Sequence, residues 1–426
     1  MRSLTDRHTW PQVTIVIATH NGQGHLESCL TALQTLDYPP ERHRIVVVDN
    51  ASTDGTATFL AQRFPSVKLV YSPFKLGFAA ANNLGFAEQP SDFFVTLNND
   101  TVVTPGWLAE LVRPALADAT IGLVTGKLIL LPDRLRVRLR CPEARSGPLD
   151  LPGDVWLDGV RVTVERLGPP NPTYLEFGVP VDPGHRPRDL RLSLLPSVGG
   201  VVEFAIGDDR LVPATRGATE ELTFTIADNT VVRSVVQNAG SIVFRDGRSR
   251  DRGAVVGRDY HYFADDRGQF DREEEVFAGC GASLLLRSAM LADVGRFDER
   301  FFAYYEDTDL SWRARLRGWR VVYAPKAVVR HAHRGTSGDW SDRFVFYTQR
   351  NRLMLLVKLA AAEVVVEQLA RSFVAAGLAG PARSGPRLVA LGDLIRRLPG
   401  LLTSRARIHA TRRLPRGEID WWWADN

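Results

Sequence analysis

The sequence predicts an α/β fold: an open, mostly parallel sheet that is interrupted by an inserted all-β domain and followed by a C-terminal helical segment. Three observations predict this order. Short apolar runs alternate with amphipathic stretches over residues 1–131, short alternating runs with Pro and Gly turns fill 132–236, and helical spacing dominates after 346. We therefore expect a discontinuous α/β domain over 1–131 and 237–345, an insert over 132–236 and a basic helical region over 346–426.

The first part of the α/β domain contains four predicted strands. Continuous apolar runs at 13–18 and 44–49 flank an amphipathic stretch at 24–36, which is typical of a parallel sheet covered on both faces. Further strands are predicted at 67–71 and 93–97. Ligands of such a sheet gather at the carboxyl ends of its strands.

Regularly spaced short strands predict a β-sandwich of roughly a hundred residues in the insert. The expected strands are the alternating runs 160–164, 174–177, 190–195, 201–206 and 222–226. Glycan binding and a purely architectural or dimerising role are both compatible with such an insert.

The α/β pattern resumes after the insert. An apolar run over 277–286 predicts a strand, 288–294 predicts a helix, and 320–323 is strand-like. This second part therefore completes the α/β domain.

The C-terminal region is helical and basic. Apolar residues after Phe346 lie on one helix face, 380–386 is expected to end that helix, and a second helix is predicted over 388–410. This region contains 13 Lys and Arg against six Asp and Glu, which is basic enough to seek an anionic surface. The charges on the first helix count against a membrane span and favour a helix that either packs on the α/β domain or lies on a membrane. The three tryptophans at 421–423 suit either a membrane interface or packing on a neighbouring domain or subunit.

Composition excludes several classes of protein. Cys29, Cys141 and Cys280 are far apart, so neither a disulfide framework nor a zinc site is implied. Residues 1–11 lack an apolar signal region, and we expect neither export nor a membrane span.

The expected location is the cytoplasm, with the inner face of the cell membrane as a possible contact for the basic region. No nucleic-acid partner is expected, and the oligomeric state is left open.

Two acidic motifs carry the predicted chemistry. Asn98-Asn99-Asp100 directly follows the apolar run 93–97, where a divalent cation can bridge a diphosphate. Glu306-Asp307, within the motif 304–310, supplies carboxylates that could deprotonate an attacking hydroxyl. Together they indicate sugar transfer from a nucleotide diphosphate donor.

With these motifs in order, the chain resembles the glycosyltransferase family 2 enzymes, specifically the rhamnosyltransferase-like branch with the GT-A fold. Each motif is weak alone, but the ordered series is specific and covers most of the chain outside the insert and the extreme C-terminus. The matching segments are 16–21, 47–56, 76–78, 82–85, 97–100, 237–240, 295–315, 331–333 and 350–352.

The resemblance implies a donor site. Asp49, at the end of the second strand, occupies the position that hydrogen-bonds the nucleotide base, although an Asp there also caps turns. Asp54, which precedes Gly55, is expected to be a helix cap instead. Further nucleotide-sugar contacts are implied at Thr19, Asn21, Asn82, Asn83, Asn98, Asn99 and Gly281.

The resemblance also implies a metal. Asp100 takes the last position of the family's Asp-x-Asp motif, and Asn98 stands at the first. A single carboxylate with diphosphate oxygens and water can hold Mg²⁺ or Mn²⁺, and a simple turn residue is the alternative. His331 and His333 lie on one face of an extended segment, where the resemblance places a metal or diphosphate contact, and His333 is slightly preferred.

By resemblance Asp307 is the general base, with Glu306 beside it. The alternative is an acidic helix N-terminus in which Asp309 pairs with Arg313, and both can be true. Arg350 and Arg352 could grip the phosphate of a donor or lipid acceptor, or lie on a solvated or carboxylate-paired helix face.

The expected activity is inverting, metal-dependent transfer of a sugar, rhamnose from dTDP-rhamnose, to a glycan or polyprenyl-linked acceptor of cell-surface polysaccharide. Two rivals remain. A sugar-phosphate nucleotidyltransferase normally carries a basic Gly-rich loop near the N-terminus, and residues 20–24 contain no Lys or Arg. A carbohydrate-binding protein with a relic core would not need Asp49, Asp100 and Asp307 together.

Overall fold

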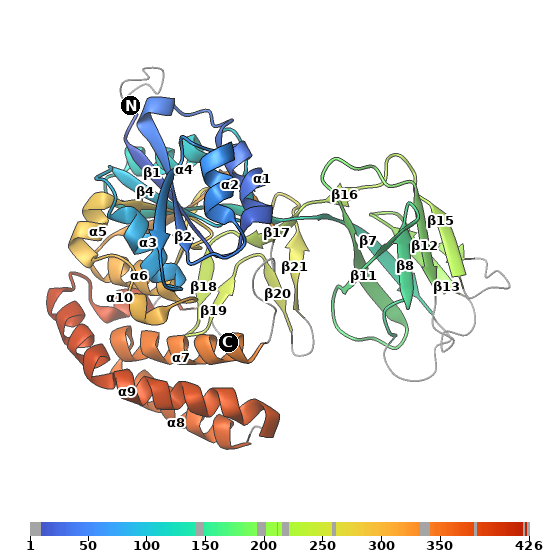
Figure 1. The fold of residues 1–426 in the computed structure, drawn as a ribbon. Helices are drawn as coiled ribbons and strands as arrows, with labels where there is room; N and C mark the ends of the chain where they lie inside the picture. The colour runs from blue at the N-terminus through green and yellow to red at the C-terminus, as the bar shows by residue number, and fades with distance from the viewer. Residues whose placement is uncertain are drawn as a thin grey trace. The chain divides into compact units, whose positions relative to one another are not determined.

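A computed structural model shows the fold (Figure 1). It describes residues 10–141, 149–193, 202–210, 212–214, 221–257, 261–332, 341–378, 381–420 and 422–423. Contacts divide the chain into two compact units. The first unit contains 1–128, 238–252 and 271–426, and the second contains 129–237 and 253–270. Residues 253–270 thus belong to the second unit, whereas the sequence division had placed them in the α/β domain.

The first unit is built on a mixed sheet with the strand order β6–β23–β4–β1–β2–β3. Strands β1 to β4 are parallel, and β23 runs antiparallel between β4 and β6. Their bounds are β1 Val13–Thr19, β2 His43–Asn50, β3 Lys68–Ser72, β4 Phe93–Leu97, β6 Ile121–Leu130 and β23 Ser283–Arg287. The parallel order brings the carboxyl ends of β1, β2 and β4 to one edge.

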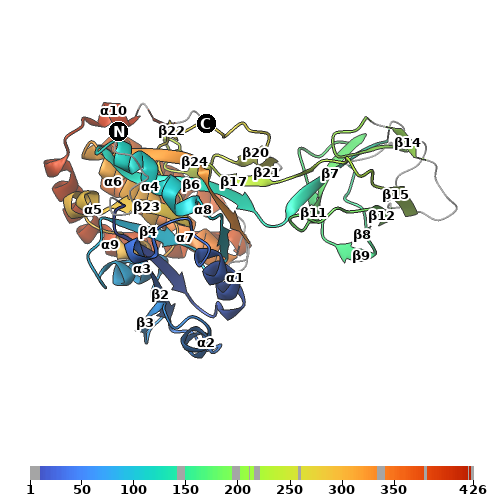
Figure 2. The same ribbon diagram turned by 90° about the horizontal axis from the view of Figure 1, so that it is seen from above.

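Helices cover this sheet as Figures 1 and 2 show. Buried aliphatic residues of the strands, such as Ile15 and Ile17, join Leu26, Leu30 and Trp107 of the helices in one core, which is the apolar packing that stabilises such a layered fold. The helices are α1 Gln23–Leu33, α2 Thr56–Arg63, α3 Phe78–Phe86, α4 Trp107–Ala117, α5 Ser288–Val294 and α6 Glu306–Leu316.

A second set of strands lies next to the edge that holds the carboxyl ends of β1, β2 and β4. The strand β24 (Arg320–His331) pairs with β5 (Thr101–Val103) in a register that places His331 opposite Thr101. The hairpin of β18 (Ser241–Val243) and β19 (Ser249–Asp251) follows the segment 237–240. The two-residue strand β22 (Glu274–Glu275) also pairs with β24.

The second unit contains two antiparallel sheets that share one apolar core. One sheet has the order β10–β11–β7–β13–β14, with β16 paired to β7, and the other has the order β15–β12–β8–β9. Their bounds are β7 Asp133–Arg140, β8 Asp154–Leu157, β9 Val160–Val162, β10 Glu165–Arg166, β11 Tyr174–Val181, β12 Asp189–Ser193, β13 Val202–Ile206, β14 Val212–Ala214, β15 Glu221–Thr225 and β16 Val232–Arg233. This is the sandwich architecture that the alternating runs predict.

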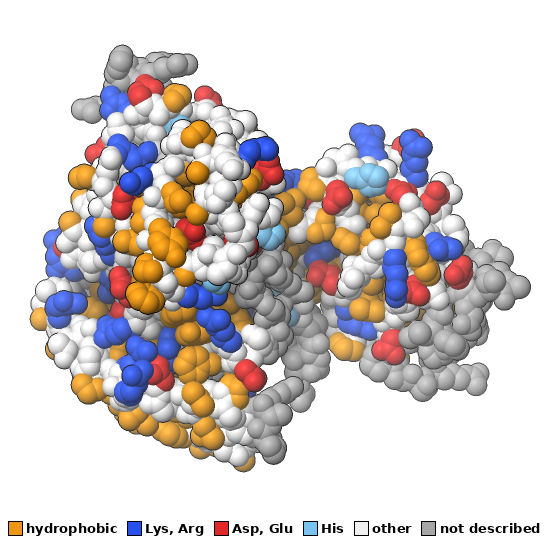
Figure 3. Space-filling view, viewed as in Figure 1, with side chains coloured by type: hydrophobic (Ala, Val, Ile, Leu, Met, Phe, Trp, Pro, Cys, Tyr) orange, Lys and Arg blue, Asp and Glu red, His pale blue; other side chains and the backbone are white. Residues whose placement is uncertain are grey.

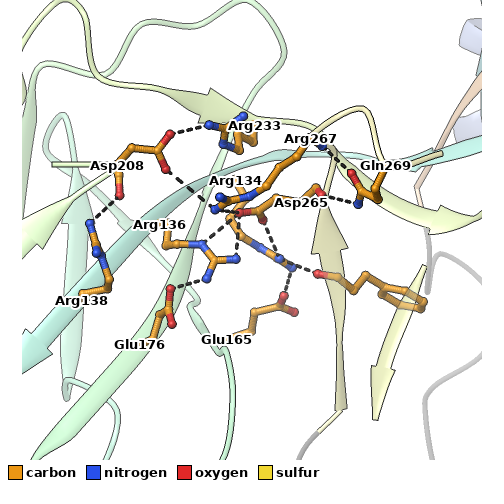
Figure 4. A network of polar contacts seen from close by, with 12 residues as sticks. Arg134, Arg136, Arg138, Glu165, Glu176, Asp208, Arg233, Asp265, Arg267 and Gln269 are labelled. Carbon is orange, nitrogen blue, oxygen red and sulfur yellow. Dashed lines mark hydrogen bonds and ion pairs between the residues drawn. The ribbon is translucent and has the colours of Figure 1, made fainter. Parts of the chain in front are cut away.

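A polar network in the second unit surrounds Asp265, which is almost fully buried (Figure 4). Arg134 and Arg136 of β7 contact its two carboxylate oxygens at 3.2 and 2.8 Å, and also pair with Glu165 and Glu176. Asp265 lies in β21 (His261–Asp265), between β17 (Val235–Asn238) and β20 (Ala254–Val256). These ion pairs explain why 253–270 belongs to this unit.

The described part of the C-terminal region contains the helices α7 Asp342–Leu359, α8 Ala362–Leu378, α9 Pro381–Thr411 and α10 Arg416–Asp420. Two sequence expectations are wrong here. The first helix ends at Leu359, because Ala360 adopts an extended backbone, and α9 already begins at Pro381 within the expected break. Within the described ranges, no helix combines the length and apolarity needed to cross a membrane.

Trp422 and Trp423 pack inside the first unit. Arg315 lies 4.0 Å over the ring of Trp422, and Trp423 makes an edge contact with Trp312. Packing therefore accounts for these two rings, while Trp421 lies outside the described residues.

Candidate active site

The carboxyl ends of β1, β2 and β4 are linked by polar side chains. Asn99 donates a 2.9 Å hydrogen bond to Thr19 Oγ1, and both side chains are buried. Asn21 accepts from Thr53 N at 2.8 Å, while Asp49 accepts from Ser52 N at 2.9 Å. These predicted donor contacts therefore lie at one edge of the sheet.

Asp54 has the capping role expected for it. Its carboxylate accepts from Gln23 N at the start of α1 and from Thr56 N at the start of α2, both at 3.1 Å. It therefore fixes the two loops that follow β1 and β2.

Asp100 and His331 meet in a buried pair. His331 Nε2 lies 3.0 Å from Asp100 Oδ1 and 3.3 Å from Asn98 Nδ2. Burial alone would raise the pKa of Asp100, but the His331 ring outweighs it and lowers that pKa. The β24–β5 pairing creates this contact, which joins residues more than two hundred positions apart.

The second acidic motif lies against the same edge. Gly281 N donates to Asp307 Oδ2 at 2.9 Å, and the next residue, Ala282, accepts from Asn98 N at 3.1 Å. Thr96 at the end of β4 also donates to the Gly281 carbonyl at 2.7 Å. The loop before β23 therefore connects the Asn98–Asp100 turn to the N-terminus of α6.

Burial changes the acidity of Glu306 and Asp307. It is the main reason that the pKa of both carboxyls is raised, and the charge of Asp307 raises the pKa of Glu306 further. Glu306 is only 5% exposed, and among the described residues its Oε2 has no hydrogen-bond partner. An unsatisfied buried carboxylate oxygen is costly, which favours a ligand group at this point.

Asp251 is a site residue that sequence reasoning missed. It ends β19 and accepts a 2.6 Å hydrogen bond from Asn238 Nδ2. It also lies close enough to Asp307 and His331 for these two residues to shift its pKa in opposite directions. Burial, and then the charge of Asp307, raise its pKa to about 6. The segment 237–240, with Asn238, pointed to this region, but no spacing in the sequence links it to Asp251.

The loop before α6 has an unusual backbone. Phe302, Tyr304 and Tyr305 have φ values of 67°, 69° and 71°, a region that bulky residues rarely adopt. Asn351 Nδ2 holds this loop by donating to the carbonyls of Phe301, Ala303 and Tyr304. Helix α7 thus positions the segment that carries Glu306 and Asp307.

Arg350 and Arg352 are not brought to this edge. Arg350 contacts Asp393 and the Phe301 carbonyl, whereas Arg352 turns toward α8, and both are buried. For Arg350 the structure favours the carboxylate-paired alternative.

Two asparagines have partly internal roles. Asn83 exchanges hydrogen bonds with the backbone of Phe297 and contacts Glu299, so it joins the two sequence halves. Asn82 donates to Phe78 O, and within the described ranges its buried Oδ1 has no partner. His333 lies outside the described residues.

The residues at the Asn98–Asp100 turn fit a divalent cation. Asp100 Oδ1 is buried and, among the described residues, accepts no well-aligned hydrogen bond, although His331 lies at ion-pair distance. A carboxylate and an imidazole suit Mn²⁺, and ions of this kind keep non-protein ligands such as phosphate oxygens. Within the described part of the chain no group of three or more His, Cys, Asp or Glu side chains is arranged so that it could hold a metal ion by itself, so most ligands would come from substrate and water.

Comparison with known proteins agrees with this geometry. The family model described as "Glycosyl transferase family 2" matches residues 14–134, and "Glycosyltransferase like family 2" matches 236–352. N-acetylglucosaminyl-diphospho-decaprenol L-rhamnosyltransferase of Mycobacterium tuberculosis is 24% identical over 335 residues, covering 76% of this chain and 77% of that protein. The pre-mycofactocin glycosyltransferase of the same organism is 44% identical over 66 residues, covering 16% of this chain and 14% of that protein.

Among solved structures, TarS 1–349 of S. aureus in complex with UDP-GlcNAc has a TM-score of 0.44 at 13% identity, covering 96% of this chain and 88% of that one. This likeness is too distant to carry an argument. The two family matches and the long relative suffice: the chain belongs to glycosyltransferase family 2 and is a rhamnosyltransferase-like enzyme that uses a nucleotide-sugar donor.

Proposed function

We propose that the protein transfers rhamnose, with inversion, from dTDP-rhamnose to a polyprenyl-diphosphate-linked glycan acceptor during cell-surface polysaccharide synthesis. The relative that covers 76% of the chain is named as a rhamnosyltransferase acting on N-acetylglucosaminyl-diphospho-decaprenol. This name supports both rhamnose as the transferred sugar and a polyprenyl-diphosphate-linked acceptor. The observation that carries the chemistry is the junction through Gly281 and Ala282, which joins Asp307 to the Asn98–Asp100 turn.

In the proposed reaction, Asp307 takes the proton of the acceptor hydroxyl while the hydroxyl oxygen bonds to the anomeric carbon. The bond from that carbon to the diphosphate oxygen breaks, and the nucleoside diphosphate leaves with the electron pair. Asp49 would orient the base, while Thr19, Asn21 and Asn99 would shape the donor loops. When bound, a divalent cation supplies positive charge that stabilises the departing diphosphate, and Asp100 and His331 would hold it.

Product analysis tests this function. The purified protein is incubated with dTDP-rhamnose, UDP-GlcNAc or GDP-mannose, a short-chain N-acetylglucosaminyl-diphospho-prenol, and Mn²⁺ or Mg²⁺. We expect transfer of rhamnose with release of dTDP. In a parallel incubation with dTTP and rhamnose 1-phosphate, release of pyrophosphate would instead identify a nucleotidyltransferase. Glycan binding with neither donor cleavage nor transfer would identify a carbohydrate-binding protein.

The division into catalytic, inserted and C-terminal domains belongs to the same proposal. The second unit would serve either glycan binding or architecture, and the C-terminal region would contact the cytoplasmic face of the membrane, where polyprenyl-linked acceptors reside.

A further inference from the structure

The C-terminal helices line a basic cavity that shares no lining residue with the Asp100–Asp307 edge. The cavity has a volume of about 310 Å³ and lies among α7, α8, α9 and the β18–β19 turn. Its lining includes Arg248, Arg352, Arg371 and Arg387 but one acidic residue, Asp246. Arg248 pairs with Asp246 and Arg371 pairs with Glu367, so Arg352 and Arg387 supply the remaining positive charge of the cavity, which suits an anion.

Arg352 is the buried cation of this cavity. Its guanidinium donates to Asp246 O, Gln368 Oε1 and Ser372 Oγ, all of which are neutral, and the residue is 9% exposed. No carboxylate of the described residues lies within ion-pair distance of Arg352 or Arg387. Asp246 is near enough to attract Arg352 electrostatically, but no ion pair neutralises this buried cation, so an anion in the cavity would stabilise it.

Two of the helices around the cavity, α8 and α9, present apolar side chains to solvent. In α8, Val366, Phe373 and Val374 lie on a different face from the cavity-lining residues, whereas Leu378 follows Arg371 by two helical turns on the same side. Figure 3 shows hydrophobic side chains along the lower edge of the molecule, where α8 and α9 lie in Figure 1. The exposed residues are Val366, Phe373, Val374 and Leu378 of α8, and Leu388, Val389, Ile395 and Leu402 of α9, each more than half exposed.

Charge on these helices favours a membrane as the occupant of this surface. Helix α9 contains six arginines and one aspartate. A two-fold contact with a second copy would bring two copies of this arginine-rich surface together, which is repulsive. An anionic bilayer offers phosphate to the arginines and acyl chains to the exposed apolar residues.

We propose that the cavity among α7, α8 and α9 binds the phosphate of an anionic phospholipid headgroup while the exposed apolar residues of α8 and α9 enter the bilayer interface. This site shares no lining residue with the Asp307 edge, and the proposal does not depend on which sugar is transferred. The proposal extends the expected membrane contact by naming its ligand, an anionic phospholipid headgroup, and the residues of α7, α8 and α9 that bind it.

Vesicle co-sedimentation of the full chain tests the proposal. We expect binding to phosphatidylcholine vesicles that contain phosphatidylglycerol and little binding to phosphatidylcholine alone. Arg371→Gln with Arg387→Gln should weaken binding by at least about ten-fold. The matched control, Arg396→Gln with Arg413→Gln, removes two exposed arginines that do not line the cavity and should change binding much less.

A second pair of variants tests the apolar contact. Leu378→Ser with Leu388→Ser should weaken vesicle binding, while Leu116→Ser in α4, which is 45% exposed, should not. Thermal unfolding of each variant verifies the fold, and Arg387→Gln alone serves if a double variant is unstable.

Three results would overturn the site. One is equal binding to both kinds of vesicle, another is equal loss of binding in the control and cavity variants, and the third is calorimetric binding of soluble glycerol phosphate without any binding to vesicles. The cavity variants should still release dTDP at the wild-type rate in a membrane-free assay. That result would show that a failure of the lipid site does not contradict the proposed transfer reaction.

Discussion

Asp307 lies among carboxylates, and that setting determines how the proposed base responds to pH. Burial is the main cause of its raised pKa, and Asp251 is close enough for the two charges to repel each other. Because only the ionised form of Asp307 can accept a proton, turnover should rise as pH increases through this raised pKa and level off above it.

The rise of turnover with pH is the acidic limb of the pH profile. Asp251→Asn should move this limb to lower pH, because the substitution removes a neighbouring negative charge while retaining the side-chain shape. The pH dependence of kcat with saturating donor measures the shift. Asp246→Asn, a change in the same hairpin but in the lipid cavity, is the control and should leave the limb in place. An unchanged or upward shift for Asp251→Asn would exclude electrostatic coupling to the base.

Asp100→Ala should weaken the metal-dependent part of nucleotide binding. The affinity for dTDP is measured by calorimetry with Mn²⁺ and with a chelator, and the wild-type protein should bind more tightly with Mn²⁺. In the variant the two affinities should become similar, because a lone carboxylate provides most of the protein's charge toward the cation. Wild-type affinity that is equal with and without metal would remove this role from Asp100.

At the scale of elements, α6 and α7 are joined by a buried ion network. Lys358 of α7 is 1% exposed, contacts Asp298 at 2.6 Å and also pairs with Asp309 of α6. Asp309 accepts from Arg313 at 2.8 Å, the i+4 pair that the sequence predicted as the structural role of this acidic helix start. The network leaves Asp307 as the carboxylate of the first helical turn that reaches Gly281.

Lys358→Ala should lower the free energy of unfolding by about 3–5 kcal/mol, because it leaves two buried carboxylates without their cation. Chemical denaturation measures the change. Glu367→Gln breaks the exposed pair with Arg371 and should cost less than about 1 kcal/mol. Similar losses in both variants would show that burial of the Lys358 pairs is not what stabilises this junction.

Sequence patterns predicted most elements because their signals are local. Apolar runs located β1 to β4, and strand-end polarity located Asp49 and Asp100. The helix break after Leu359 was missed because Ala360 and Ala361 carry no Gly or Pro signal. Asp251 was missed because only the pairing of β18 with β19 brings it to the site, and the internal partners of Arg350 depend on how α7 packs.

At the scale of the whole molecule, the account rests on a long-range arrangement within the first unit. Strands β4, β23 and β24 bring three distant segments together, which are the Asn98–Asp100 turn, Gly281 and His331. No local pattern determines that arrangement, since the second unit separates the two sequence halves that supply it. The ordered series of motifs nevertheless predicted it, because the motifs share one active site in the family that the chain resembles.

The most direct test of the central claim is a comparison of Asp307→Asn with the wild-type protein for both rhamnose transfer and dTDP affinity. The account predicts that transfer falls by about 10²–10⁴-fold, since the amide cannot take the hydroxyl proton, while dTDP affinity in Mn²⁺ stays close to that of the wild type. Turnover equal to that of the wild-type protein would contradict it.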